Sequence, residues 1–212
     1  MATKRSPLVM CLTNSVAANF TANCLLAIGA KPAMVDEPCE AEELARVADA
    51  MLVNLGTVTA RQAEAMRRAI AVASVRGVPW VLDPVGVQIL SYRAELAREF
   101  IACKPSVIRC NAAEAAALGE TGCVTLVTGE VDRLGGREIR GGVPLLQSVT
   151  ATGCAQGGLC AAFLGMGLPP EEAARSASVL MKTAGERAFV RARVPGSFKV
   201  ALVDALWELS HD

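Results

Sequence analysis

Short runs of continuous aliphatic residues alternate with helical segments along most of this 212-residue chain. We predict strands for these runs at 51–55, 79–82, 106–110 and 123–128, and turn or polar residues end each of them. Strands without polar alternation are buried on both faces, and strands separated by helices form a mainly parallel sheet. The pattern therefore predicts a single α/β domain over 1–212, with a central sheet covered by helices on both faces.

The helices are predicted from apolar periodicity and from their terminal residues. After an apolar turn and a short strand at 33–35, a helix at 40–50 has an acidic first turn that suits the helix dipole. Thr59 is expected to cap the next helix, at 60–76, and Gly77 to end it. Further helices are predicted at 91–103, 111–119, 153–166, 170–190 and 197–209, with a hairpin-like segment through 132–142.

Charge and histidine content exclude several classes of function. Lys and Arg number 21, as do Asp and Glu, and aromatic residues make up 4 %, so we expect no nucleic-acid or anionic-membrane partner. The single histidine, His211, lies next to the C-terminus. That position argues against a Ser-His-Asp triad and against a His-ligated metal.

The spacing of the cysteines and one uncharged stretch indicate where in the cell the protein is expected. The 8 cysteines include no C-x-x-C pair and no signal peptide is evident, so we expect reduced cysteines in a cytoplasmic protein. No charged residue occurs from 141 to 170, but this stretch contains a proline, polar residues and several glycines. We interpret it as a buried loop that leads into a buried helix, because a spanning helix needs about 20 predominantly apolar residues.

Polar and glycine residues follow four of the predicted strands, where ligands gather in open α/β sheets. Ordinary turn chemistry would explain any one of these runs, but four together indicate a ligand site. Arg109 ends a strand and is suited to clasp phosphate oxygens. Asp83 and Glu114 are candidate Mg²⁺ ligands, with helix capping or a surface ion pair as the alternative.

The run from Thr150 to Cys154 opens a predicted helix that is rich in small residues. Free N–H groups at a helix start bind anions, so a phosphate or a developing oxyanion fits there. A Thr-capped helix packed tightly by small residues explains the run equally well. A helix N-terminus can lower the pKa of a thiol, so Cys154 is expected to supply a thiolate as base or nucleophile, unless it is an inert buried cysteine.

Two common nucleotide motifs do not occur in this sequence. Neither G-x-G-x-x-G nor G-x-x-x-x-G-K-[ST] is found, which disfavours Rossmann dinucleotide and P-loop sites. The remaining features indicate an α/β enzyme that handles anions, and by themselves they do not choose its substrate.

Eight runs in collinear order cover nearly the whole chain: 11–14, 21–30 with Pro32 and Met34, 54–57, 79–86, 104–114, 127–132, 149–154 and 195–198. Together they resemble the motifs of the hydroxyethylthiazole kinase family, within the ribokinase-like superfamily. The resemblance implies a ribokinase-like three-layer sandwich. It also implies phosphorylation of the alcohol of 4-methyl-5-(2-hydroxyethyl)thiazole in thiamine salvage, with ATP and Mg²⁺.

The resemblance also implies residue roles and an assembly. Cys154 would act at the hydroxyl, in the place where most ribokinase-like enzymes carry an aspartate, and Gly153 would belong to the anion hole. The assembly implied is a homotrimer with active sites at subunit interfaces. The other implied site residues are Met34, Ala151 and Asn14 for the thiazole, Arg109, Thr128 and Asn111 for ATP, and Asp83 and Glu114 for the metal.

One departure from the family pattern keeps other functions open. Relatives usually carry a long segment with another helix where this chain passes from 117–120 almost directly into 121–123. A parallel crossover needs about a dozen residues or more, which the remaining short helix barely provides. The alternatives are a non-catalytic thiazole or nucleotide binder, and a ribokinase-like kinase of another small alcohol.

Overall fold

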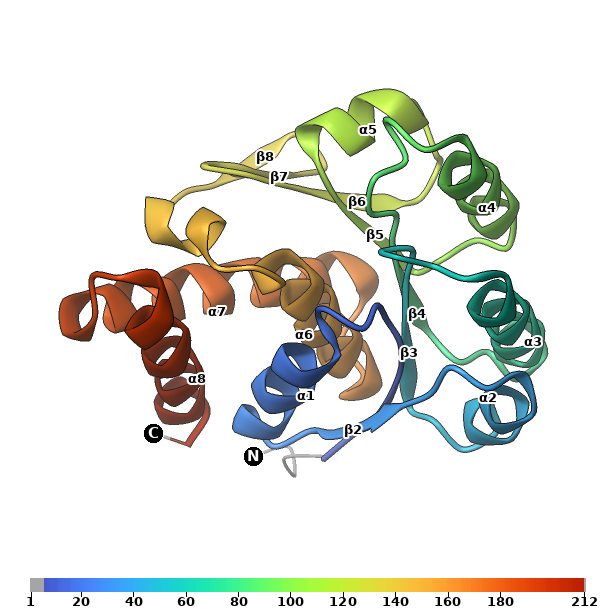
Figure 1. The fold of residues 1–212 in the computed structure, drawn as a ribbon, viewed down its shortest axis with the longest axis horizontal. Coiled ribbons are helices and arrows are strands. Elements are labelled where there is room, and N and C mark those ends of the chain that lie inside the picture. The colour runs from blue at the N-terminus through green and yellow to red at the C-terminus, as the bar shows by residue number, and fades with distance from the viewer. Residues whose placement is uncertain (1–5, 212) are drawn as a thin grey trace.

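The computed structural model describes residues 6–211 and shows a sheet between two layers of helices (Figure 1). The sheet has eight strands in the order β2-β1-β3-β4-β5-β6-β7-β8. Six are parallel, and the last two add an antiparallel hairpin at one edge. The strands are β1 (Leu8–Leu12), β2 (Lys31–Met34), β3 (Ala50–Asn54), β4 (Trp80–Asp83), β5 (Val107–Asn111), β6 (Val124–Thr128), β7 (Asp132–Leu134) and β8 (Arg137–Ile139).

Two hydrophobic clusters, one on each side of the sheet, confirm the predicted α/β architecture with helices on both faces. One face is covered by α1 (Ala18–Ala27), α6 (Thr152–Gly165), α7 (Pro170–Arg191) and α8 (Pro195–His211). The other is covered by α2 (Pro38–Ala45), α3 (Ala60–Arg76), α4 (Ser91–Ala102) and α5 (Ala112–Leu118). A short 3₁₀ helix, η1 (Pro144–Ser148), precedes α6.

Local capping chemistry sets the ends of α3 as predicted. Thr59 and Gln62 form a capping box, in which the Thr59 side chain accepts from the Gln62 N–H. At the other end Gly77 adopts a left-handed conformation with φ 69°, which a residue without a Cβ adopts at little cost.

Three sequence predictions at the N-terminal end are wrong. Residues 8–12 form β1, which was not predicted, and the segment from residue 25 expected to be a turn belongs in part to α1. The helix expected at 40–50 ends at Ala45, and Ala50 is instead the first residue of β3. Ala50 pairs with Val9 of β1, so sheet pairing overrides the helical preference of this alanine-rich stretch.

The uncharged stretch contains a buried helix. Residues 144–148 form η1, and α6 follows, with most of its residues buried between the sheet and neighbouring helices. Among residues 6–211, no helix has both the length and the apolar character needed to cross a bilayer.

The parallel strands bring their carboxyl ends together along one side of the sheet, which we call its carboxyl edge. In the register of β3 and β4, Asn54 lies directly beside Asp83. In the register of β5 and β6, Asn111 lies directly beside Thr128. Polar residues that are far apart in the sequence therefore become neighbours at this edge, as the strand endings predicted.

The crossover from β5 to β6 contains only α5, a helix of 7 residues. The predicted short link is thus confirmed. Cys123, Thr125 and Val127 remain half-buried, whereas every residue of β3 is buried. The sheet keeps its parallel order across this short crossover but is covered less completely there.

Candidate active site

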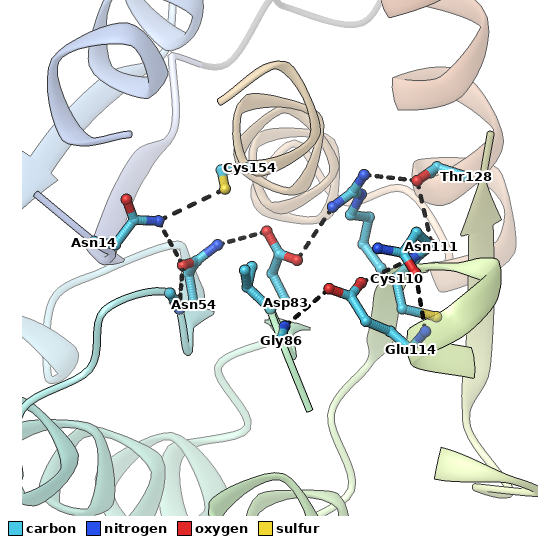
Figure 2. A network of polar contacts seen from close by, with 12 residues as sticks. Asn14, Asn54, Asp83, Gly86, Cys110, Asn111, Glu114, Thr128 and Cys154 are labelled. Carbon is cyan, nitrogen blue, oxygen red and sulfur yellow. Dashed lines mark hydrogen bonds and ion pairs between the residues drawn. The ribbon is translucent and has the colours of Figure 1, made fainter. Parts of the chain in front are cut away.

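A continuous row of hydrogen bonds crosses the carboxyl edge of the sheet (Figure 2). Asn14, in the segment after β1, donates from Nδ2 to Oδ1 of Asn54 at 2.8 Å. Asn54 in turn donates from Nδ2 to Oδ2 of Asp83 at 2.5 Å. Asn54 and Asp83 have no exposed surface, so this part of the row is sealed from solvent.

Arg109 continues the row from β5. Its guanidinium donates to Asp83 Oδ1 at 3.3 Å and to Thr128 Oγ1 at 2.6 Å. The Thr128 hydroxyl then donates to the carbonyl of Cys110. The Nε of Arg109 has no partner in the described part of the chain, although it is buried. A buried guanidinium with an unused donor is suited to bind an anion that enters the site.

The buried pair of Asp83 and Arg109 is electrostatically coupled. Burial raises the pKa of the Asp83 carboxyl, and Arg109 offsets this in part. Burial acts most strongly on the pKa of Arg109 and lowers it, but Asp83, Cys154 and Glu114 together outweigh burial, so that pKa is raised. The guanidinium therefore stays charged, and the pair is a fixed structural element of the site.

The N-terminus of α6 faces Arg109. Ala155 makes the first helical hydrogen bond, to the carbonyl of Ala151, and no side chain caps the helix. A Cβ at residue 153 would overlap the guanidinium of Arg109, so only glycine permits this close approach. Gly153 thus places a helix N-terminus and a guanidinium together, an arrangement that is suited to bind an anion.

Cys154 lies at the same helix start, and its sulfur accepts from Asn14 Nδ2 at 3.7 Å. Burial raises the pKa of the Cys154 thiol to about 12, and the nearby Asp83 carboxylate adds to this, while Arg109 opposes it. The expected lowering by the helix N-terminus is therefore wrong. At neutral pH Cys154 is a neutral thiol that can orient a hydroxyl, and it is not a ready thiolate.

Glu114 and Asn111 form a capping box at the start of α5. Glu114 accepts from the backbone N–H of Asn111 at 2.9 Å and from that of Gly86 at 3.0 Å. Helix capping, the alternative reading of Glu114, is thus present, and the bond to Gly86 ties α5 to the turn after β4. Asp83, by contrast, is neither a cap nor a surface ion pair.

Both candidate metal ligands have their carboxylate oxygens bonded to protein donors. Asp83 is held by Asn54 and Arg109, and Glu114 by two backbone N–H groups. Within residues 6–211 no cluster of three or more His, Cys, Asp or Glu could hold a metal. Mg²⁺ usually keeps several waters and binds substrate phosphates, so these two buried carboxylates fit a metal that is held mainly by phosphate and attracted by their charge.

A cavity of about 550 Å³ opens beside Arg109 and Gly153. A second hollow of about 490 Å³ adjoins it and shares Gly129, Leu146, Gln147 and Lys182 with it. Ligand pockets for small molecules have volumes of about 300–1,000 Å³. The two hollows together offer room for a ligand considerably larger than phosphate.

Two predicted thiazole-binding residues lie outside the hydrogen-bonded row. Met34 ends β2, on the same edge of the sheet, and is 39 % exposed. Ala151 precedes α6 with φ 72°, a left-handed conformation that is unfavourable for alanine. The other eight predicted residues meet at the carboxyl edge: Asn14, Asp83, Arg109, Asn111, Glu114, Thr128, Gly153 and Cys154.

Sequence reasoning missed the side chains that hold the walls of the cavity. Lys182 of α7 is buried, donates to the carbonyls of Glu130 and Gly141, and pairs with Asp132. Asp132 also accepts from Gln156 at 3.1 Å. The available signal was a lysine among the small and apolar residues of a helix, where a charge needs a partner. Asn54 was noticed at a strand end but given no role.

Comparisons with known proteins agree on one family. A model of the hydroxyethylthiazole kinase family matches residues 2–121 and 116–212. The hydroxyethylthiazole kinase of Escherichia coli (strain 55989 / EAEC) is 42 % identical, over 99 % of this chain and 92 % of its own. That of Leptospira borgpetersenii serovar Hardjo-bovis (strain JB197) is 41 % identical, over 98 % and 90 %.

Solved structures give the same result. The hydroxyethylthiazole kinase of Pyrococcus horikoshii OT3 superposes with a TM-score of 0.93 at 36 % identity, over 97 % of this chain and 89 % of its own. The ADP complex of Bacillus subtilis pyridoxal kinase has a TM-score of 0.63 at 16 % identity, over 85 % and 92 %. This second likeness supports the fold alone.

The comparisons also indicate where this chain lacks a segment that its relatives have. The two parts of the family match meet at 116–121, between α5 and β6. The alignment with the E. coli relative spans 240 positions, whereas the chain has 212 residues, so at least 28 positions of that alignment have no counterpart here. This agrees with the short crossover seen in the fold.

Proposed function

The chain belongs to the hydroxyethylthiazole kinase family, and from that premise we propose how its site performs the reaction. The protein is a phosphotransferase that acts on the alcohol of hydroxyethylthiazole in thiamine salvage, and kinase chemistry of this kind uses ATP. The observation that carries the mechanism is the guanidinium of Arg109 packed against Gly153 at the start of α6.

The triphosphate of ATP binds where Arg109 and the α6 N-terminus meet. Arg109 supplies its unpaired Nε, and Thr128 and Asn111 line the same cavity. The adjoining hollow, with Lys182 between the two, offers space for the nucleoside. Two sources of positive potential at one point favour the charge that develops on the transferred phosphoryl group.

Mg²⁺ is expected to neutralise phosphate charge when it is bound with ATP. Asp83 and Glu114 are buried and their oxygens accept protein hydrogen bonds, so they would attract the metal through their negative charge while the phosphates hold it. Arg109 keeps the Asp83 carboxyl directed toward the phosphate side.

In the transfer step, the hydroxyl oxygen of the thiazole forms a bond to the γ-phosphorus. The bond from that phosphorus to the β–γ bridging oxygen breaks, ADP leaves with the electron pair, and the proton of the hydroxyl passes to an oxygen of the transferred phosphoryl group and from there to water. Cys154 orients the hydroxyl as a neutral hydrogen-bonding partner, since the raised pKa of its thiol leaves little thiolate. Phosphoryl transfer depends mainly on positioning and charge stabilisation, so a strong base is not required.

The thiazole ring is proposed to lie near Asn14 and Ala151. Met34 is separate from the hydrogen-bonded row and partly exposed on an edge strand, which suits contact with the substrate in a neighbouring subunit. We therefore propose that the protein forms a homotrimer with active sites at its subunit interfaces. Light scattering of the purified protein would test it, and a monomer at assay concentration with full activity would refute it.

The test of function is product formation. With ATP, Mg²⁺ and the thiazole alcohol, we expect equal amounts of ADP and thiazole phosphate. Thiazole binding without ADP release would indicate the non-catalytic binder, and release of ADP only with other small alcohols would indicate another substrate. ATP and reduced cysteines both suit the proposed cytoplasmic location.

A further inference from the structure

Two buried amides lie between the thiol and the guanidinium of the site, and chemistry fixes the orientation of each. The N–H of Ala17 donates to Oδ1 of Asn14 at 2.9 Å. A backbone N–H cannot accept, so the Nδ2 of Asn14 must face the other way. It meets both Asn54 and the sulfur of Cys154.

The amide of Asn54 is fixed in the same manner. Its Oδ1 accepts from the N–H of Gly56 at 2.9 Å and from Asn14 at 2.8 Å. Its Nδ2 is thereby directed at Asp83, which accepts at 2.5 Å. Both groups that meet at Oδ1 are donors, so a flipped amide would lose three hydrogen bonds at once.

Close packing leaves this amide no alternative position. Asn54 is fully buried at the end of β3, with Asp83 beside it in the sheet register. A Cβ at Gly56 would meet the Asn14 and Asn54 amides, so the turn after β3 packs directly on them. A side chain with this many fixed contacts cannot relax to compensate for a change in its neighbours.

We propose that Asn54 is a positioning residue that couples the acceptor end of the site to its phosphate end. Through Asn14 it sets the place of the Cys154 sulfur, and through Asp83 it sets the place of Arg109 (Figure 2). The inference rests on the proposed function, because it assigns the hydroxyl to Cys154 and the phosphates to Arg109. The role requires that Asn54 donate to Asp83, which an aspartate of equal size cannot do without an added proton.

Two variants and a matched control test this role. Asn54→Asp keeps the shape and removes the donor, and Asn54→Ser removes both links. Val53→Ala is the control, because Val53 is the neighbouring buried residue of β3 and packs in the cluster on the opposite face. The titratable groups that face the altered position are Asp83 of β4, Arg109 of β5, Glu114 of α5 and Cys154 of α6.

For Asn54→Asp we expect kcat to fall about 100-fold, with much smaller changes in KM, as for a misplaced catalytic group. Asn54→Ser should lose kcat to at least the same extent, and Val53→Ala should keep the wild-type kcat. Combining Asn14→Ala with Asn54→Ser should add little to the larger single loss, because both break one row.

The inference is overturned if Asn54→Asp keeps wild-type kcat, if its KM rises as much as its kcat falls, or if the Asn14 and Asn54 losses are fully additive. A separate readout needs no catalysis. The losses of unfolding free energy caused by Asn14→Ala and Asn54→Ser should be less than additive in the double variant, because the two amides bond each other. If wild type makes no thiazole phosphate, the proposed function fails, whereas this coupling in stability still tests the link between Asn14 and Asn54.

Discussion

The two halves of the sheet are built differently, although the site lies across both. In the half from β1 to β4, strands β3 and β4 are completely buried, and full-length helices cover both faces. In the half from β5 to β8, the crossover is the short α5, and the sheet ends in a hairpin whose outer strand β8 is largely exposed. The first half contributes site amides and a carboxylate that are bonded to the protein, and the second contributes Arg109, whose buried Nε has no partner among the described residues.

The site residues follow this division. Asn14, Asn54 and Asp83 come from the first half. Their side-chain amide and carboxylate atoms all have hydrogen-bond partners within the protein. Arg109 comes from the second half and retains the unpaired Nε. In the proposed function, the half from β1 to β4 therefore sets the geometry of the site, and the half from β5 to β8 supplies the cation that binds phosphate.

The largest effect is expected from Arg109→Met, which removes the phosphate-binding charge of the open half. We expect kcat/KM to fall about 10³-fold or more, as when an arginine that stabilises a phosphoryl transition state is removed. Steady-state kinetics with varied ATP would measure it. Arg109→Lys is the control, since it keeps the charge and loses the forked geometry.

Less than a tenfold loss for Arg109→Met would break the comparison, because phosphate binding would then have to come from elsewhere. Circular dichroism of the variant must first show a folded protein, since the change leaves the Asp83 carboxyl buried without its cation.

Core substitutions should reduce the unfolding free energy more in the half from β1 to β4 than in the half from β5 to β8. Leu52→Ala in β3 removes a fully buried side chain and should cost about 2–5 kcal/mol in unfolding free energy. Leu118→Ala in α5 removes a half-buried one and should cost about 1 kcal/mol. Urea unfolding would measure both. Equal costs would show that the short crossover is held as firmly as the centre of the sheet.

The reactivity of the Cys154 thiol should depend on pH in a way that tests its burial. Because its pKa is raised to about 12, thiolate forms only as pH approaches that value. Alkylation of Cys154 should therefore rise about tenfold for each unit between pH 7 and 10, without a plateau. Peptide mass spectrometry would follow it, with the exposed Cys39 as the internal comparison. A plateau near pH 8 would restore the thiolate mechanism.

A substitution of Cys154 can distinguish a role in orienting the hydroxyl from a role in packing. Cys154→Ser should lower kcat more than it weakens thiazole binding, because the oxygen can still hydrogen-bond but lies at a different distance from the hydroxyl. Isothermal titration beside the kinetic assay would compare the two. Equal losses in both would assign Cys154 a packing role.

The smallest effect is expected from Ala151→Gly at the start of α6. Alanine in a left-handed conformation is strained by about 1 kcal/mol, which glycine would relieve. A modest rise in Tm by calorimetry is the expected result. A lower Tm would mean that the methyl group contributes packing that outweighs the strain.

The sequence allowed the sheet, most helices and eight neighbouring site residues to be predicted, because buried strands and their polar endings are local patterns. The strand β1 was missed because Leu8–Leu12 is short and lies in a segment without a clear period. The pKa of Cys154 was predicted in the wrong direction, since burial by other elements cannot be read from a helix start. Asn54 had no assigned role, because its importance lies in three partners from separate segments.

The short link after α5 has a practical consequence. Glu120 and Gly122 are exposed, and α5 is already closed at Gly119 by a bond to Ala115. The two parts of the family match meet at this point, and the alignment with the E. coli relative is longer than this chain, so we expect an insertion here to be tolerated. Because α5 returns the chain to the amino ends of the strands, a fluorescent protein or an affinity handle inserted here would lie on the side of the sheet away from Arg109 and Gly153 and would interrupt no strand.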